Sequence, residues 1–132
     1  MHFGRKIIGC GALSMMLSVI LGAVGAHLLA GVLSERWLQV YQTAVSYQIY
    51  HSLGLMFCGL LLLHYSGNKA LNIAAVLMAV GIILFSGSLY LLVLWPYPWL
   101  GILTPVGGVC WIIAWALLAW VLIKPQRTLR HK

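Results

Sequence analysis

The chain has almost no acidic residues. Among its 132 residues, Glu35 is the single carboxylate side chain, and only 7% of all residues are charged. Soluble domains carry about 25% charged residues, so this composition excludes an ordinary soluble protein. The shortage of carboxylates also disfavours an enzyme without excluding one, because general acid–base catalysis and metal-assisted hydrolysis usually employ them.

Cysteine is also scarce, and its three residues are not paired. Cys10, Cys58 and Cys110 lie in three different apolar stretches, and no Cys-x-x-Cys motif is present. Neither a disulfide framework nor a closed zinc site is indicated by such an odd, scattered set. We expect three buried thiols that pack as small apolar side chains.

Long apolar runs are what the chain has in abundance. Hydrophobic residues make up 63% of it, and a helix needs roughly 20 apolar residues to cross the hydrocarbon core of a bilayer. Four windows satisfy that requirement, at residues 7–29, 44–63, 70–94 and 100–123. The remaining residues are too few for another domain. The sequence therefore predicts an all-α membrane protein, with one transmembrane domain over residues 1–132 that forms an antiparallel four-helix bundle.

The basic residues predict how this bundle is oriented. Arg36 lies in the first connection, whereas the other seven flank the N-terminus, the 64–69 loop or the C-terminus: Arg5, Lys6, Lys69, Lys124, Arg127, Arg130 and Lys132. The positive-inside rule then places both termini in the cytoplasm. Nucleic acid is rejected as a partner, because these charges do not form a patch with interleaved aromatics. The bilayer itself is the expected partner.

Two further patterns mark helix ends. Ser34 can cap a second helix that runs from Glu35 to about His64, with Glu35 at the positive end of the helix dipole. Between the third and fourth windows, two prolines break the helix and three aromatic residues gather at the outer water interface, in the segment 95–99.

Small residues predict where helices approach closely. In the first helix they recur at intervals of four, at Ser14, Ser18, Gly22 and Ala26, a pattern typical of packing between membrane helices. The second helix, the fourth helix or another copy of the chain could each supply the partner. Gly107 and Gly108, which follow Thr104 and Pro105, are interpreted as a helix start with close packing in preference to an opened pocket.

Polar residues gather in the outer halves of all four predicted helices. Because polar side chains are costly in hydrocarbon unless they are paired, we expect them to face the bundle interior. The residues of this predicted cluster are His27, Tyr47, Gln48, His51, Ser86, Tyr90 and Thr104. Ser88 lies on nearly the opposite side of its helix from Ser86 and Tyr90.

Two interpretations of the cluster are possible. The favoured one is an interhelical hydrogen-bond network that fixes the register of the helices. The alternative is that His27 and His51 face one cavity and bind a metal ion, a haem, a quinone or a lipid head group. Two imidazoles without a third ligand are a weak indication of a metal, so the cofactor stays open.

Four motifs together resemble the YgdD-like family of small bacterial inner-membrane proteins of unknown function. They read GAVGAH at residues 22–27, TAVSYQIYH at 43–51, FSGSLY at 85–90 and TPVGG at 104–108. The resemblance implies a four-span protein of the bacterial inner membrane, with these polar residues as the hallmark of the family. It implies no reaction.

The expected function is therefore that of a structural or accessory membrane component, which assembles with another membrane protein or with itself. The alternative function is a ligand-binding module that uses His27 and His51. The two differ in geometry. A binding site requires both histidines to converge on an open cavity, whereas a network leaves no space between bonded side chains.

Overall fold

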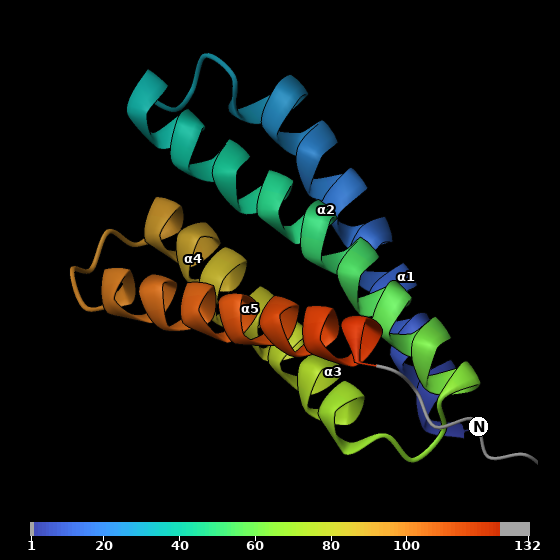
Figure 1. Cartoon of the computed structure of the whole chain (residues 1–132). Coiled ribbons are helices and arrows are strands. Elements are labelled where there is room, and N and C mark those ends of the chain that lie inside the picture. Colours follow the sequence, from blue (N-terminus) through green and yellow to red (C-terminus); the bar gives the residue numbers. More distant parts are fainter. Residues whose placement is uncertain (1, 125–132) are drawn as a thin grey trace, which may run out of the picture.

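The computed structural model describes residues 2–124, which form helices and short connections without a strand (Figure 1). The helices are α1 (His2–Val24), η1 (Gly25–Leu29), α2 (Glu35–His64), α3 (Lys69–Gly81), η2 (Ile82–Gly87), α4 (Ser88–Leu94) and α5 (Leu100–Ile123). Both η segments are π-helices that continue a neighbouring α-helix without a break. Four long helices result.

These four helices are long and apolar enough to cross a membrane. They cover His2–Leu29, Glu35–His64, Lys69–Leu94 and Leu100–Ile123, and each contains one of the four predicted windows. The all-α fold with four membrane-spanning helices is confirmed.

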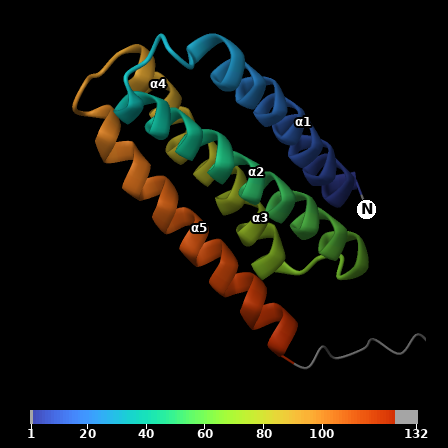
Figure 2. The ribbon, with the colours of Figure 1, turned by 90° about the horizontal axis from the view of Figure 1, so that it is seen from above.

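Successive helices are antiparallel, which gives the molecule two distinct ends. The start of α1, the α2–α3 turn and the end of α5 lie at one end, and the other two connections lie at the opposite end (Figures 1 and 2). Arg5, Lys6, Lys69 and Lys124 therefore gather at the first end, whereas Arg36 lies at the second.

Three of the four long helices supply most of a common hydrophobic core, to which α1 adds Ile7. Large buried side chains fill it, among them Leu55 of α2, Met78 of α3, and Trp111 and Leu118 of α5. The Trp111 indole N–H donates a hydrogen bond of 3.1 Å to the Met78 carbonyl. Gly81 is required beside it, because a Cβ there would lie 2.2 Å from the indole nitrogen. This core positions α5 against α3.

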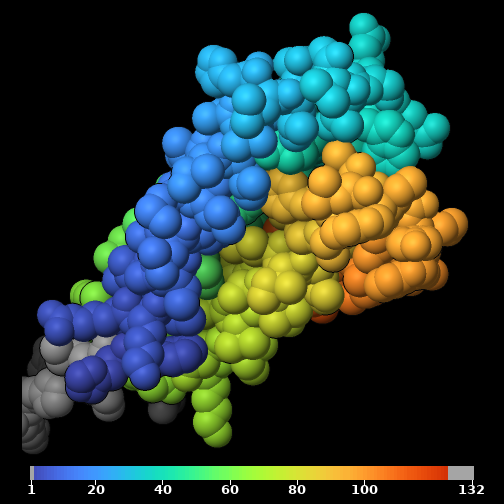
Figure 3. Space-filling model, turned by 180° about the vertical axis from the view of Figure 1, so that it is seen from behind, coloured from blue at the N-terminus to red at the C-terminus, as the bar shows by residue number. Residues whose placement is uncertain are grey.

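The fourth long helix, α1, packs mainly on α2. Figure 2 places it at one side of the molecule, with α5 at the other. From behind, the surfaces of α1 and of α3 and α4 lie side by side, with α2 visible between them (Figure 3). Only a narrow stripe of α1 is buried, and the rest of its apolar surface faces outward.

Four buried residues of α1 and η1 recur every seven residues, at Gly4, Gly11, Ser18 and Gly25, with Ile7 buried beside them. A seven-residue repeat keeps one face of a helix against its partner in a left-handed supercoil. The backbones come very close, because a Cβ at Gly11 would lie 3.0 Å from the Ser52 carbonyl oxygen. Gly59 of α2 is equally tight, at 2.9 Å from the Gly4 carbonyl oxygen.

The predicted packing residues fall unevenly on these interfaces. Ser14 and Ser18 lie in the α1–α2 interface, Gly22 is half-buried, and Ala26 is exposed. In α5, a Cβ at Gly107 would lie 2.5 Å from the Phe85 backbone nitrogen, whereas one at Gly108 would meet only ordinary contacts.

The helix ends lie close to the predicted positions, but the predicted capping hydrogen bond is not formed. α2 begins at Glu35 as expected, but the Ser34 side chain makes no capping hydrogen bond. At α3, the Asn68 side chain caps the helix by accepting from the Leu71 N–H at 3.2 Å. The aromatic residues of the 95–99 segment are exposed.

The expectation of three buried thiols is correct for one cysteine. Cys58 is buried in the core, Cys110 is half-buried, and Cys10 is exposed. Cys10 lies outside the stripe through which α1 contacts α2, which explains its exposure.

Candidate functional site

Gln48 of α2 lies at the centre of a polar network that joins three helices. Its side-chain oxygen accepts a hydrogen bond of 2.7 Å from the Tyr90 hydroxyl on α4. Its side-chain nitrogen donates to the Ser14 carbonyl on α1 at 3.0 Å. The Ser52 hydroxyl extends the network by donating to the Ser14 hydroxyl at 2.7 Å. We call Ser14, Gln48, Ser52 and Tyr90 the Gln48 network.

Three more hydrogen bonds link helices around this network. The Tyr41 hydroxyl donates to the Leu21 carbonyl at 2.5 Å, between α2 and α1. The Ser86 hydroxyl donates to the Ala44 carbonyl at 2.8 Å, between η2 and α2. Between α4 and α5, Ser88 and Thr104 share a hydrogen bond of 2.7 Å.

These bonds leave no sealed polar group without a partner. Among the described residues, no side-chain nitrogen or oxygen atom is both buried and unbonded. Buried polar groups that are fully satisfied stabilise one arrangement of helices, and an unsatisfied group would carry a large desolvation cost. The geometry thus resembles that of a hydrogen-bond network that joins neighbouring helices.

His51 lies next to the network, in an aromatic cluster. Its ring stacks on the Trp111 indole, with ring centroids 3.5 Å apart and planes within 5°. Its Nδ1 is 2.7 Å from the Tyr47 carbonyl oxygen. The ring of Tyr47 stacks on Phe85 of η2 at 4.9 Å and is itself 41% exposed. His51 is only 7% exposed.

His27 does not join this cluster. It lies in η1, its side chain is exposed, and no hydrogen bond or ring contact links it to another predicted site residue. Within residues 2–124, no group of three or more His, Cys, Asp or Glu side chains could hold a metal ion.

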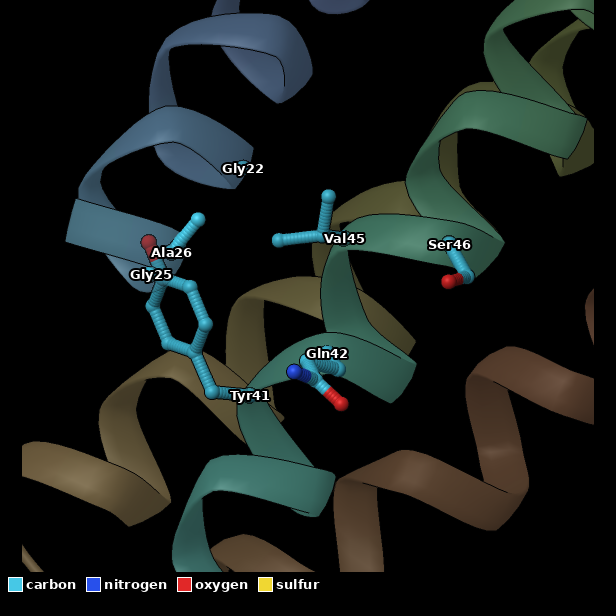
Figure 4. Close-up of a pocket in the computed structure, with 7 residues that line it drawn as sticks. All are labelled: Gly22, Gly25, Ala26, Tyr41, Gln42, Val45 and Ser46. Carbon is cyan, nitrogen blue, oxygen red and sulfur yellow. The ribbon is translucent and has the colours of Figure 1, made fainter. Parts of the chain in front are cut away.

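A shallow groove of about 240 Å³ lies between the end of α1 with η1 on one side and α2 on the other (Figure 4). Its lining combines small residues of the first helix with polar and apolar residues of α2: Gly22, Gly25, Ala26, Tyr41, Gln42, Val45 and Ser46. Neither His27 nor His51 is among them.

Six of the seven predicted cluster residues, all except His27, form hydrogen bonds or ring contacts with α2, η2, α4 or α5. Tyr47 is one of the six. The other five are Gln48, His51, Ser86, Tyr90 and Thr104. Sequence reasoning did not assign Ser14, Tyr41, Ser52, Ser88 or Trp111 to the site. Ser52 lies four residues after Gln48, on the same helix face, and this spacing is the signal that could have identified it.

Comparison with known proteins identifies the family. Residues 21–108 match a family described as "Protein of unknown function (DUF423)". A UPF0382 membrane protein of Bacillus subtilis, YwdK, is 44% identical over 120 residues, which cover 91% of this chain and 98% of that protein. A UPF0382 membrane protein of Staphylococcus epidermidis is 44% identical over 122 residues, with 91% and 97% covered.

A third relative, a UPF0382 membrane protein of Staphylococcus aureus, is 46% identical over 116 residues, covering 86% of this chain and 92% of that protein. No solved structure matches significantly. Because the family match spans more than half of the chain and the relatives are aligned over nearly their whole length, the chain belongs to the DUF423 family as an integral membrane protein of unknown function.

Proposed function

We propose that the protein is a structural or accessory component of the bacterial inner membrane, in which the polar cluster joins helices instead of transforming a substrate. The Gln48 network carries this proposal. Both ends of the Gln48 amide are used, one toward Ser14 on α1 and the other toward Tyr90 on α4.

The strength of these bonds suits a role in register. Interhelical hydrogen bonds in membranes contribute on average about 0.6 kcal/mol each. Bonds of this size contribute less to the stability of the bundle than the packing of the core does. They nevertheless penalise any rotation of α1 or α4 relative to α2. The narrow buried stripe of α1 makes such a restraint useful, since α1 packs mainly on one neighbour.

The same proposal includes a location and an orientation. Arg5, Lys6, Lys69 and Lys124 lie at one end of the antiparallel helices, and the positive-inside rule assigns that end to the cytoplasm. Both termini are then cytoplasmic, and residues 1–132 form one transmembrane domain. Arg127, Arg130 and Lys132 lie outside the described residues.

The partners that fit are the lipid bilayer, another membrane protein or a second copy of the chain. The narrower resemblance to the YgdD-like proteins is part of the proposal too. It is supported by the position of its four motifs, all of which fall inside the matched residues 21–108.

The experiment is metal and optical analysis of the purified protein in detergent, next to a His27→Ala, His51→Ala double variant. We expect both preparations to lack stoichiometric metal and a haem band. We also expect His51→Ala alone to lower the melting temperature and His27→Ala alone to leave it unchanged, because only His51 stacks on Trp111. Stoichiometric metal or haem that the double variant loses would overturn the structural role.

The alternative, a ligand-binding module, is favoured by one specific observation at His51. One ring nitrogen of this buried side chain has no partner among the described residues.

A further inference from the structure

The hydrogen bond of His51 decides which of its ring nitrogens carries the proton. A backbone carbonyl only accepts, so the 2.7 Å contact between Nδ1 and the Tyr47 oxygen requires Nδ1–H. In the neutral imidazole the other nitrogen, Nε2, then carries a lone pair and acts as an acceptor. His51 therefore offers an acceptor whose identity is set by the helix backbone.

This acceptor has no partner within the described part of the chain, and it is not completely sealed from the surface. His51 makes one hydrogen bond there, through Nδ1. No described side-chain nitrogen is both sealed from the surface and unbonded, so Nε2 reaches the molecular surface although His51 is only 7% exposed. A buried acceptor in hydrocarbon is costly until it binds a donor.

The depth of His51 limits what that donor can be. Sixteen helical steps separate it from Glu35 and thirteen from His64, or roughly 24 Å and 20 Å at 1.5 Å per residue. The hydrocarbon core is about 30 Å thick. His51 thus lies near the middle of the membrane, far from water and from phospholipid head groups. A small molecule that donates there from the lipid must be membrane-soluble.

The surroundings of His51 suit a flat ring. Trp111 stacks on the imidazole, and the Trp115 ring stands edge-on to it at 6.1 Å. Tyr47 lies nearly parallel to His51 at 6.0 Å. Tyr47 and Trp115 are 41% and 44% exposed, so both offer open ring surface for offset or edge contacts with another aromatic group.

We propose that His51 Nε2 accepts a hydrogen bond from the ring hydroxyl of a membrane-soluble quinol, whose ring rests against Tyr47 and Trp115. The reduced form is selected, since a quinol hydroxyl donates a hydrogen bond and a quinone carbonyl does not. This site is separate from the Gln48 network and does not depend on the structural role of that network.

The test uses the full-length protein in lipid nanodiscs and a short-chain benzoquinol kept reduced without oxygen. Binding is followed by tryptophan fluorescence and, independently, by equilibrium partition of the ligand against empty nanodiscs. The matched ligands are the corresponding quinone and the quinol dimethyl ether, which keeps the ring but lacks a hydroxyl donor. We expect saturable quinol binding and about tenfold weaker binding of both other ligands, the loss that corresponds to one hydrogen bond.

The matched variants are His51→Phe, which keeps a stacking ring without an acceptor, and His27→Phe at the exposed histidine. His51→Phe is expected to bind quinol about tenfold more weakly, and His27→Phe to bind it like the native chain. The ligand comparison on the native protein stands even where His51→Phe fails to fold. Equal binding of quinol and its dimethyl ether, unchanged quinol binding by folded His51→Phe, or no saturable quinol binding overturns the proposal.

Discussion

The two faces of α2 are built from opposite kinds of residue. Toward α1 the backbones approach each other at small residues, as at Gly11 and Gly59, and side chains such as Met56 pack directly on the glycines. Toward α3 and α5 it consists of large side chains such as Leu55, Met78 and Trp111. One face is therefore sensitive to added volume and the other to removed volume. The hydrogen bonds of the Gln48 network are expected to contribute less to stability than either face, because each bond contributes little free energy.

Removal of the largest core side chain should have the greatest effect. Trp111→Ala creates a cavity, loses the hydrogen bond to the Met78 carbonyl and removes the ring that His51 stacks on. We expect a loss of about 3–5 kcal/mol in the free energy of unfolding. Unfolding in mixed detergent micelles measures it. Trp120→Ala, at an exposed position of the same helix, is the control. Equal losses in the two variants would contradict the core role of Trp111.

Added volume on the opposite face should cost somewhat less. A Cβ in Gly59→Ala lies 2.9 Å from both the Gly4 carbonyl oxygen and the Ile8 nitrogen, so backbone must move. Overpacking of this kind costs about 1–3 kcal/mol. Gly9→Ala, where nothing lies within 4 Å of the new Cβ, should be neutral by the same measurement. If Gly59→Ala is as stable as Gly9→Ala, the close approach of α1 and α2 is wrong.

The next effect comes from the centre of the polar network. Gln48→Leu removes the bonds to Ser14 and Tyr90 and leaves the Tyr90 hydroxyl without that acceptor. At about 0.6 kcal/mol per interhelical bond, we expect a loss of roughly 1 kcal/mol. Gln42→Leu, at an exposed position on a different face of α2, serves as the control in thermal unfolding. A stabilised Gln48→Leu variant would show that the network costs more than it contributes.

The smallest predicted effect sharpens the comparison. Tyr90→Phe deletes one hydroxyl and keeps the ring against Tyr41, at a centroid distance of 5.5 Å. The expected loss is about 0.6 kcal/mol. In the Gln48→Leu background the same substitution should have almost no effect, because the acceptor is already absent. A double-mutant cycle that gives no coupling between the two positions contradicts the bond.

Much of this architecture is visible in the sequence because it depends on composition. Apolar length predicts four helices, and turn residues and prolines predict where they end. Gln48, Tyr90 and Thr104 could be assigned to a polar cluster because paired polar groups turn inward. These inferences need only one helix at a time.

Features that depend on the neighbours of a helix could not be predicted in this way. Ser88 lies opposite Ser86, yet both are bonded, because the third helix has α2 on one side and α5 on the other. His27 is as polar as His51, but its side chain is exposed, and no hydrogen bond links it to a neighbouring helix within residues 2–124. In α1, an interval of four pointed to Ala26, whereas the supercoil with α2 follows an interval of seven and buries Gly25.

The π-helical segments η1 and η2 have a consequence for how the family can vary. A π-turn holds one residue more than the α-helical turn it replaces, so each segment is equivalent to a single-residue insertion that the helix has absorbed. Compared with an uninterrupted α-helix of the same sequence, the residues after the π-turn are therefore rotated about the helix axis relative to the residues before it. The two halves of such a helix thus keep independent registers, and a one-residue deletion within Ile82–Gly87 would convert the π-turn into an α-turn while Ser88, Tyr90 and Met78 keep their present neighbours.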